Sequence, residues 1–209
     1  MRFKNRREAG LLLAEKLTSY RGTPLVIYGL PRGGVVTAFE IAKHLKAPLD
    51  IICVRKIGHP NEPEFALGAV AEDGHLLGDQ IGLAAVDQSW LAKEADRERK
   101  EAARRRETYL QGRTGLPVKN KTAILVDDGV ATGYTLRLAI RELKHRHPKK
   151  IIVAVPVIPE RVAALVRVEV DELTALDVPS EIDFLGAVGA YYEEFLPVND
   201  DEVIDLLRN

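Results

Sequence analysis

Two adjacent carboxylates, Asp127 and Asp128, stand between an apolar run and a glycine-containing loop, and their types and position suit ligand chemistry. The apolar, β-branched run 122–126 before them is typical of a buried parallel strand. Residues 134–145, after the loop, have the periodicity of a helix. Ligands of open α/β sheets bind beyond the carboxyl ends of the strands, so we expect both carboxylates to face a binding crevice.

The loop that follows the carboxylates, residues 129–135, is predicted to bind an anion. Gly129 and Gly133 permit left-handed backbone or close approach, and the free N–H groups at a helix start attract phosphate. Thr132 and Thr135 add hydroxyl donors. The loop is not a Walker loop, because no Gly-Lys-Ser/Thr follows, and it is not a dinucleotide fingerprint, because the acids precede the glycines. A sugar phosphate, with its phosphate on the helix start and its hydroxyls on the acids, fits this arrangement.

The segment 123–135, AILVDDGVATGYT, closely resembles the phosphoribosyl-pyrophosphate motif of the type I phosphoribosyltransferases. The resemblance covers about residues 24–56 and 116–195. It implies an α/β fold with a mostly parallel central sheet and helices on both faces. It also implies a Mg²⁺-dependent enzyme that transfers the 5-phosphoribosyl group of phosphoribosyl pyrophosphate (PRPP) to a nitrogenous base and releases pyrophosphate.

The same resemblance assigns roles within the motif. Asp127 and Asp128 are expected to be the catalytic residues, holding the ribose hydroxyls and touching Mg²⁺ through water. The 5′-phosphate is expected on the loop and helix start, at Ala131, Thr132, Gly133, Tyr134 and Thr135. Purine-salvage members usually have an acid where Ala131 stands, so the proton donor or acceptor is unidentified and a 6-oxopurine acceptor is in doubt.

A second strand–loop–helix unit is predicted earlier in the chain, with a strand at 24–28 and a helix at 35–45. The forked guanidinium of Arg32 in its loop suits a diphosphate. The resemblance places pyrophosphate on Arg32 and Gly33, with support from Lys56 after a strand predicted at 49–55. The alternative is that Lys56 is a solvated charge at the strand end.

Residues 57–115 are interpreted as an insertion into this fold. They comprise a hairpin (65–71 and 75–77) and a long helix from an N-cap at Asp87 to about Gln111. Interleaved charges along the helix favour a solvated surface over a nucleic-acid interface. The insertion is expected to be a lid or a dimer contact, and we expect a homodimer.

Residues 178–198 resemble the C-terminal hood that stacks an aromatic ring on the base in purine members of the family. Phe184 is the candidate base platform, although a core role is the more common one for an aromatic residue. A final helix is predicted at 201–208, capped by Asn199.

Length and composition set the remaining expectations. The chain has 209 residues, 46% of them hydrophobic, which suits a single α/β domain over 1–209. Its net charge of −1 gives no sign of a nucleic-acid partner. The single cysteine, Cys53, cannot form an internal disulfide, and no apolar run is long enough for a membrane span. We therefore expect a cytoplasmic protein.

Two other functions share the motif. Some relatives keep the ligand loops but sense PRPP or nucleotides without catalysis, and this regulatory role is the main alternative. A pyrophosphokinase-like enzyme shares the fold, but the sequence has no recognisable ATP-binding feature.

Overall fold

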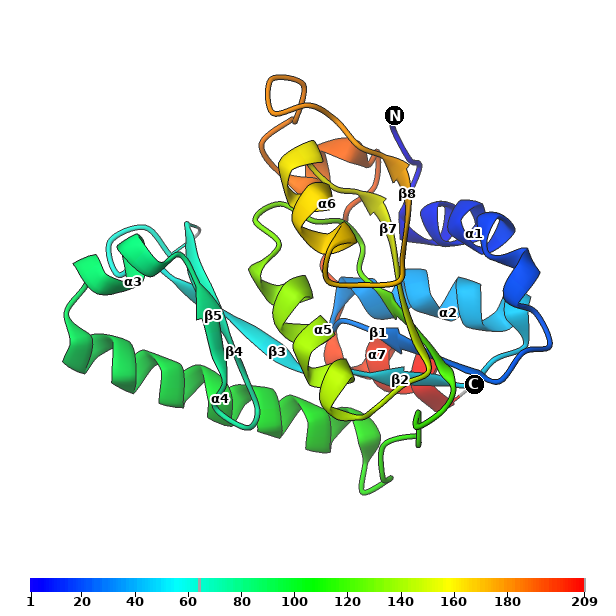
Figure 1. The fold of residues 1–209 in the computed structure, drawn as a ribbon, viewed down its shortest axis with the longest axis horizontal. Helices are drawn as coiled ribbons and strands as arrows, with labels where there is room; N and C mark the ends of the chain where they lie inside the picture. The colour runs from blue at the N-terminus through cyan, green and yellow to red at the C-terminus, as the bar shows by residue number, and fades with distance from the viewer. Residues whose placement is uncertain (64, 209) are drawn as a thin grey trace.

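The centre of the molecule is a five-stranded parallel sheet (Figure 1), as seen in a computed structural model that describes residues 1–63 and 65–208. Gly29, at the end of one strand, lies opposite Ile51 on one side and Val126 on the other. The three strands therefore end at the same level, and the loops that follow them leave the sheet together at its carboxyl-terminal end. The strand order is β2 (Leu49–Ile51), β1 (Leu25–Gly29), β6 (Thr122–Val126), β7 (Lys150–Val157) and β8 (Glu172–Asp177).

Helices cover both faces of this sheet, because its strands alternate their side chains between two apolar cores. Ile124 and Val126 pack with α1 (Arg6–Lys16) and α2 (Gly33–Leu45). Ala123 and Leu125 pack on the other face, with α5 (Tyr134–His145) and α6 (Glu160–Arg167). The predicted fold class, a mostly parallel α/β sheet with helices on both faces, is confirmed.

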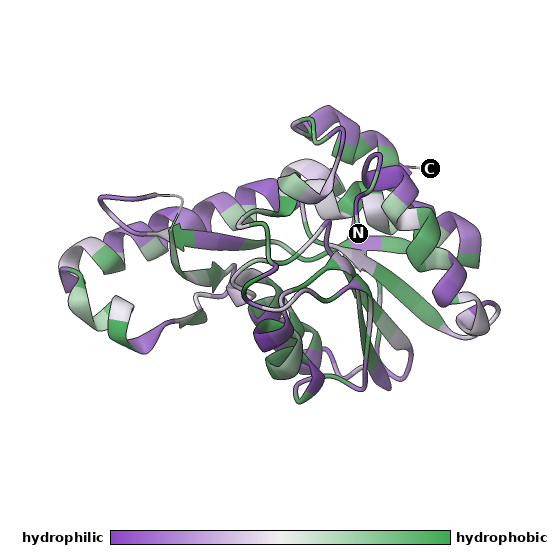
Figure 2. Cartoon of the chain, turned by 90° about the horizontal axis from the view of Figure 1, so that it is seen from above, coloured by the Kyte–Doolittle hydropathy of each residue, from purple (hydrophilic) through white to green (hydrophobic). Residues whose placement is uncertain are grey.

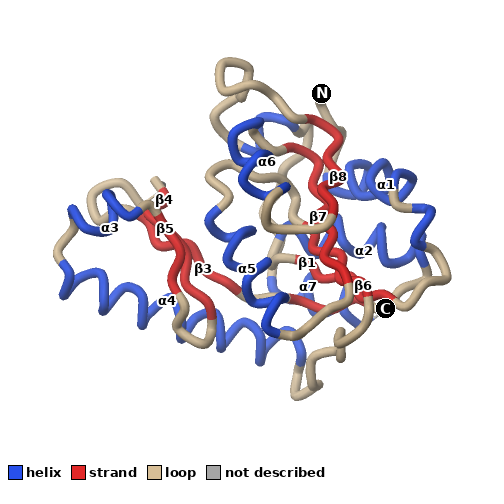
Figure 3. Tube along the Cα trace, in the orientation of Figure 1, coloured by secondary structure: helices blue, strands red, loops and turns tan. Residues whose placement is uncertain are grey.

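A second, antiparallel sheet stands beside the central one (Figure 3) and consists of β3 (Val54–Gly58), β4 (Ala66–Ala71) and β5 (Leu76–Gly78). The prediction of a single strand at 49–55 is therefore wrong. Its first half pairs with β1, and the chain then leaves the sheet after the Ile52 amide bonds to Gly29. Its second half pairs with β4, because the hairpin supplies a new hydrogen-bonding partner.

Two helices complete this part of the chain: α3 (Gln80–Ala85), which the sequence patterns did not predict, and α4 (Gln88–Leu110). Asp87 caps α4 as predicted, since its carboxylate accepts a hydrogen bond from the Trp90 amide at 2.7 Å. Hydrophilic residues predominate along α4 (Figure 2), and near its end Tyr109 and Leu110 are buried against the last helix, α7 (Asp200–Arg208). No described helix is both long enough and apolar enough to cross a bilayer.

The predicted hood, residues 178–198, contains the short 3₁₀ helix η2 (Val188–Tyr191) and is joined to the start of the chain. The Phe3 amide donates to the Tyr191 carbonyl at 2.7 Å, and the Glu193 amide donates to the Phe3 carbonyl at 2.8 Å. A similar short helix, η1 (Thr18–Tyr20), follows α1. The N-terminal segment thus fixes the hood over the end of the sheet.

Candidate functional site

The two carboxylates lie where β6 leaves the sheet, as the sequence predicts. The Asp128 amide donates to Oδ1 of Asp127 at 2.9 Å, which orients the first carboxylate. The loop then reaches α5, whose N-cap is Gly133 in the left-handed conformation, with φ of 79°. Glycine has no side chain to cap the helix, so the first N–H groups of α5 can hydrogen-bond to an anion.

Two glycines shape this loop because their neighbours leave no room for a side chain. A Cβ on Gly133 would lie 2.4 Å from Cγ1 of Val162, and a Cβ on Gly129 would lie 2.4 Å from Cγ1 of Val188. Ala131 and Thr132 are exposed at the tip, whereas Tyr134 and Thr135 are half-buried in the first turn of α5. The residues predicted to bind the 5′-phosphate therefore form one exposed tip and one helix start.

The loop after β1 packs directly against the acids. A Cβ on Gly33 would stand 1.9 Å from Oδ2 of Asp128, and a Cβ on Gly34 would stand 2.9 Å from Oδ1 of Asp127. The peptide between Pro31 and Arg32 is cis. Two segments that are about a hundred residues apart in sequence thus form one site, and only glycine fits where they touch.

Arg6 is a residue of this site that the sequence patterns did not reveal. Its Nε donates to Oδ2 of Asp128 at 2.6 Å, and both side chains are largely buried, with 12% and 16% exposure. Its guanidinium also lies 3.8 Å from the centroid of the Phe195 ring. The pattern of the N-terminal helix indicates only packing, and a single arginine among its charged residues carries no signal of this contact.

Tyr192 adds a second contact to the acids from the hood. Its hydroxyl donates to the Asp128 carbonyl at 2.5 Å, and its ring stacks on Phe195 at 4.9 Å between centroids. Burial raises the pKa of Tyr192, so this hydroxyl is a hydrogen-bond donor at neutral pH. The hood therefore supports the backbone of the acidic loop.

The environment disfavours negative charge on the acid pair. Burial, and then the charge of Asp128, raise the pKa of Asp127 well above its usual range. Burial also raises the pKa of Asp128, although the adjacent Arg6 guanidinium opposes that change. Cations that approach this pair would relieve the cost of ionising it. Oxygen ligands of this kind are those that Mg²⁺ binds.

Arg32 lies at the N-cap of α2 and points to a different acid. Its guanidinium stands 3.6 Å from Asp200 of α7, and its side chain is 41% exposed. Asp200 also accepts a hydrogen bond from the Tyr109 hydroxyl at 2.7 Å. The predicted pyrophosphate ligand Arg32 is thus paired with an acid of α7, which α4 contacts in turn.

Lys56 is on β3 of the antiparallel sheet rather than on the central sheet that carries the acids. It is half-buried and lines a cavity of about 350 Å³ with Trp90 and Glu98 of α4 among its neighbours. The predicted role of Lys56 at the pyrophosphate stays a prediction.

Phe184, the predicted base platform, is half-buried in the hood and stacks on Tyr191 with 5.8 Å between ring centroids. Val188 packs in the same apolar cluster and contacts the acidic loop at Gly129. Phe184 is thereby connected to the site through packed neighbours, and its contact with a base stays a prediction.

Comparison with known proteins identifies the family of this chain. The phosphoribosyl transferase domain family matches residues 5–193. A Mycobacterium tuberculosis H37Rv protein, whose name assigns it provisionally to the phosphoribosyl transferases, is 38% identical over 207 residues. That match covers 98% of this chain and 46% of the relative, so the chain spans about half the length of the curated relatives it matches.

Solved structures share the fold of this chain. The crystal structure of the TT1426 protein from Thermus thermophilus superposes with a TM-score of 0.78 at 43% identity, covering 99% of this chain and 98% of that one. The AQ2163 protein from Aquifex aeolicus, at 12% identity and a TM-score of 0.54 over 87% of this chain and 78% of its own, shares the fold. The chain therefore belongs to the phosphoribosyl transferase domain family, in the type I form that the sequence motif indicates.

Proposed function

We propose that this protein is a Mg²⁺-dependent phosphoribosyltransferase that transfers the 5-phosphoribosyl group of PRPP to a nitrogenous acceptor base. The observation that carries the proposal is the close contact of Gly33 with Asp128. It brings together the loop that we expect to bind diphosphate and the acids that we expect to bind ribose. In this reaction a base nitrogen forms a bond to the anomeric carbon of the ribose while that carbon's bond to pyrophosphate breaks. Family membership supports the assignment.

The protein's part in this reaction is to bind, orient and exclude water. The first turn of α5, with Thr132, Tyr134 and Thr135, would hold the 5′-phosphate through backbone N–H groups. Asp127 and Asp128 would accept hydrogen bonds from the ribose hydroxyls and favour positive charge on the ribose ring as the leaving group departs. Arg32, Gly33 and Lys56 would bind the pyrophosphate.

The acid pair also fits the Mg²⁺ that the family implies. Two largely buried carboxylates beside each other have raised pKa values, and the Arg6 side chain donates a hydrogen bond to Asp128. Asp127 and Asp128 are the residues that would hold the ion, mainly through its waters. Bound Mg²⁺ would supply charge neutralisation for the departing pyrophosphate.

The acceptor is a nucleobase-like compound that the hood would cover, with Phe184 as its platform. Ala131 is exposed at the loop tip and has no titratable group, which argues against a 6-oxopurine. The predicted homodimer and cytoplasmic location stay predictions from the sequence.

The test is a panel of acceptor bases assayed for pyrophosphate release with PRPP and Mg²⁺, beside calorimetric titration of PRPP–Mg²⁺. We expect release with one base class, and Asp128→Asn to weaken PRPP binding at least about tenfold, since it removes a charged hydrogen-bond acceptor. Tight PRPP binding without release across purines, pyrimidines and pyridine carboxylates would establish the sensor alternative instead. Unchanged PRPP affinity in Asp128→Asn would refute the site itself.

A further inference from the structure

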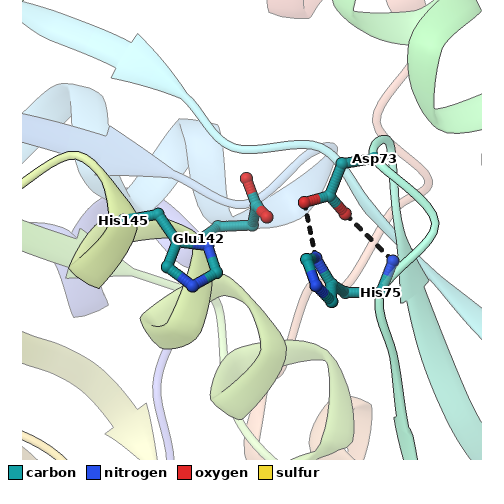
Figure 4. Close-up of side chains that lie close together, drawn as sticks. All are labelled: Asp73, His75, Glu142 and His145. Atoms are coloured by element: carbon teal, nitrogen blue, oxygen red, sulfur yellow. Dashed lines mark hydrogen bonds and ion pairs between the residues drawn. The ribbon is translucent and has the colours of Figure 1, made fainter.

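Four potential metal ligands meet where the β4–β5 hairpin lies against α5, away from the acidic loop (Figure 4). One ligand atom from each side chain lies within 4.8 Å of the corresponding atoms of the others. The hairpin contributes one carboxylate and one imidazole, and the helix contributes another of each. They are Asp73, His75, Glu142 and His145.

Each pair is placed by its own element. Glu142 and His145 are three residues apart on α5, so they project from the same side of the helix. Asp73 lies in the hairpin turn, and its Oδ2 stands 2.6 Å from Nδ1 of His75 while its Oδ1 accepts the His75 amide at 3.0 Å. Below the cluster, Leu77 of β5 packs on the apolar core that includes Leu138 of α5, which fixes the hairpin against the helix.

The donor set favours a cation at this point. Two carboxylates and two imidazoles each offer a ligand atom within 4.8 Å of the others, so one ion could bind to all four side chains. Arg141 and Lys144 line the adjoining cavity of about 250 Å³ together with Glu142 and both histidines. The positive charges of Arg141 and Lys144 disfavour ions such as Mg²⁺ or Ca²⁺, whose binding depends mainly on charge. Imidazole nitrogens are instead good ligands for transition-metal ions.

We propose a binding site for a divalent transition-metal ion of the zinc class, formed by the hairpin pair and the helix pair. Two imidazole nitrogens and two carboxylate oxygens are a donor set that Zn²⁺ accepts in tetrahedral geometry. Bonds of about 2.0–2.2 Å would bring the ligand atoms to about 3.3–3.6 Å apart. Oδ2 of Asp73 and Nδ1 of His75, which now stand 2.6 Å apart, would have to separate, whereas more distant ligand atoms would move closer. The side chains of Asp73, His75 and His145 are exposed, so they have room for these small movements.

Metal binding at this site would join the antiparallel sheet to the helix that begins at the phosphate loop. Asp73 and His75 belong to the hairpin, whereas α5 starts at Tyr134, directly after Gly133. The ion would therefore reduce movement between the hairpin and α5. The site does not depend on the proposed transfer reaction.

Calorimetric titration of ZnCl₂ into the full chain, first stripped with EDTA and then dialysed, tests the proposal. We expect one saturable site per chain. Each of His75→Ala and His145→Ala should weaken Zn²⁺ binding at least about tenfold, because even the loss of a hydrogen-bond partner of a ligand costs about that much. The matched control is His147→Asn, which removes an exposed histidine two residues beyond the site, and asparagine tolerates its positive φ of 52°. This control should keep wild-type affinity.

Two further measurements separate the outcomes. Hydrogen exchange of the amides in 71–77 and 142–147 should slow when Zn²⁺ is added to the wild type and not when it is added to His145→Ala. The Asp128→Asn variant tests whether Zn²⁺ binds at the acidic loop instead of at the proposed site. The proposal is overturned by absence of saturable binding, by wild-type affinity in both ligand variants, or by loss of Zn²⁺ binding in Asp128→Asn alone. His75→Gln replaces His75→Ala if the latter does not fold by circular dichroism.

Discussion

Nε of Arg6 donates a hydrogen bond to Oδ2 of Asp128 across 2.6 Å, although the two residues are 122 positions apart. The same guanidinium donates to the Leu196 carbonyl at 2.7 Å, so one side chain joins α1, the acidic loop and the hood. Charge-assisted hydrogen bonds of this kind are stronger than neutral ones. Arg6 therefore positions Asp128 and partly neutralises it.

The first prediction concerns this pair. Arg6→Ala leaves a largely buried carboxylate without its cation, so we expect the variant to be destabilised. A double-mutant cycle with Asp128→Ala, measured by urea unfolding, should give a coupling free energy of about 1–3 kcal/mol. Lys16→Ala, which removes an exposed cation from the same helix, is the control. Strict additivity of Arg6→Ala and Asp128→Ala would contradict the contact.

The second prediction concerns the junction of the two loops. Gly33→Ala places a methyl group where Oδ2 of Asp128 stands, so the loop or the carboxylate must move. We expect PRPP–Mg²⁺ affinity to fall at least about tenfold, because misplacing a binding group by an ångström is costly. Gly115→Ala is the matched control, since its Cβ would meet its nearest atom at an ordinary 3.4 Å. Comparable affinities for both variants would show that the loops do not cooperate.

The third prediction concerns pH. The pKa of Asp127 is raised in the folded protein above its ordinary value of 3.8, so the folded state holds this proton more tightly than the unfolded chain. The resulting stability is fully present below pH 3.8 and is lost as pH rises through the folded-state pKa. Asp127→Asn removes this loss, so we expect its stability relative to the wild type to increase from about pH 4 towards neutral.

Urea unfolding of wild type and Asp127→Asn at several pH values measures this difference. The amide oxygen of asparagine can still accept the Asp128 N–H, so the loop should keep its shape. Asp201→Asn, at an exposed position on α7, controls for loss of one negative charge. A difference in stability that does not change with pH would show that Asp127 is not perturbed.

The fourth prediction concerns the hood. If Phe184 is the base platform, Phe184→Ala should raise KM for the acceptor base while PRPP affinity stays unchanged, since stacking on a base is worth about 1–3 kcal/mol. Phe184→Tyr should retain binding. Loss of thermal stability with unchanged KM would instead assign Phe184 to packing against Tyr191.

Periodicity predicted the elements around the site well. The strand at 122–126 and the helix at 134–145 are confirmed at those bounds, because each is an uninterrupted pattern of one period. The run 49–55 is mostly apolar, so its pattern predicts one strand and cannot show where pairing passes from β1 to β4. The final helix begins at Asp200, one residue before the prediction, with Asn199 accepting the Glu202 amide.

By itself, the sequence determined the local chemistry of this protein: two acids at a strand end, glycines after them, and a helix start that can hold an anion. Those features depend on neighbours in the chain, so residue order is sufficient to predict them. Only the tertiary structure decided that Arg6 and Tyr192 support Asp128, that Arg32 lies against Asp200, and that a hairpin brings two ligands to meet Glu142 and His145. Such contacts arise when segments distant in sequence pack together. Neither periodicity nor spacing along the chain predicts which polar side chains will meet in that packing.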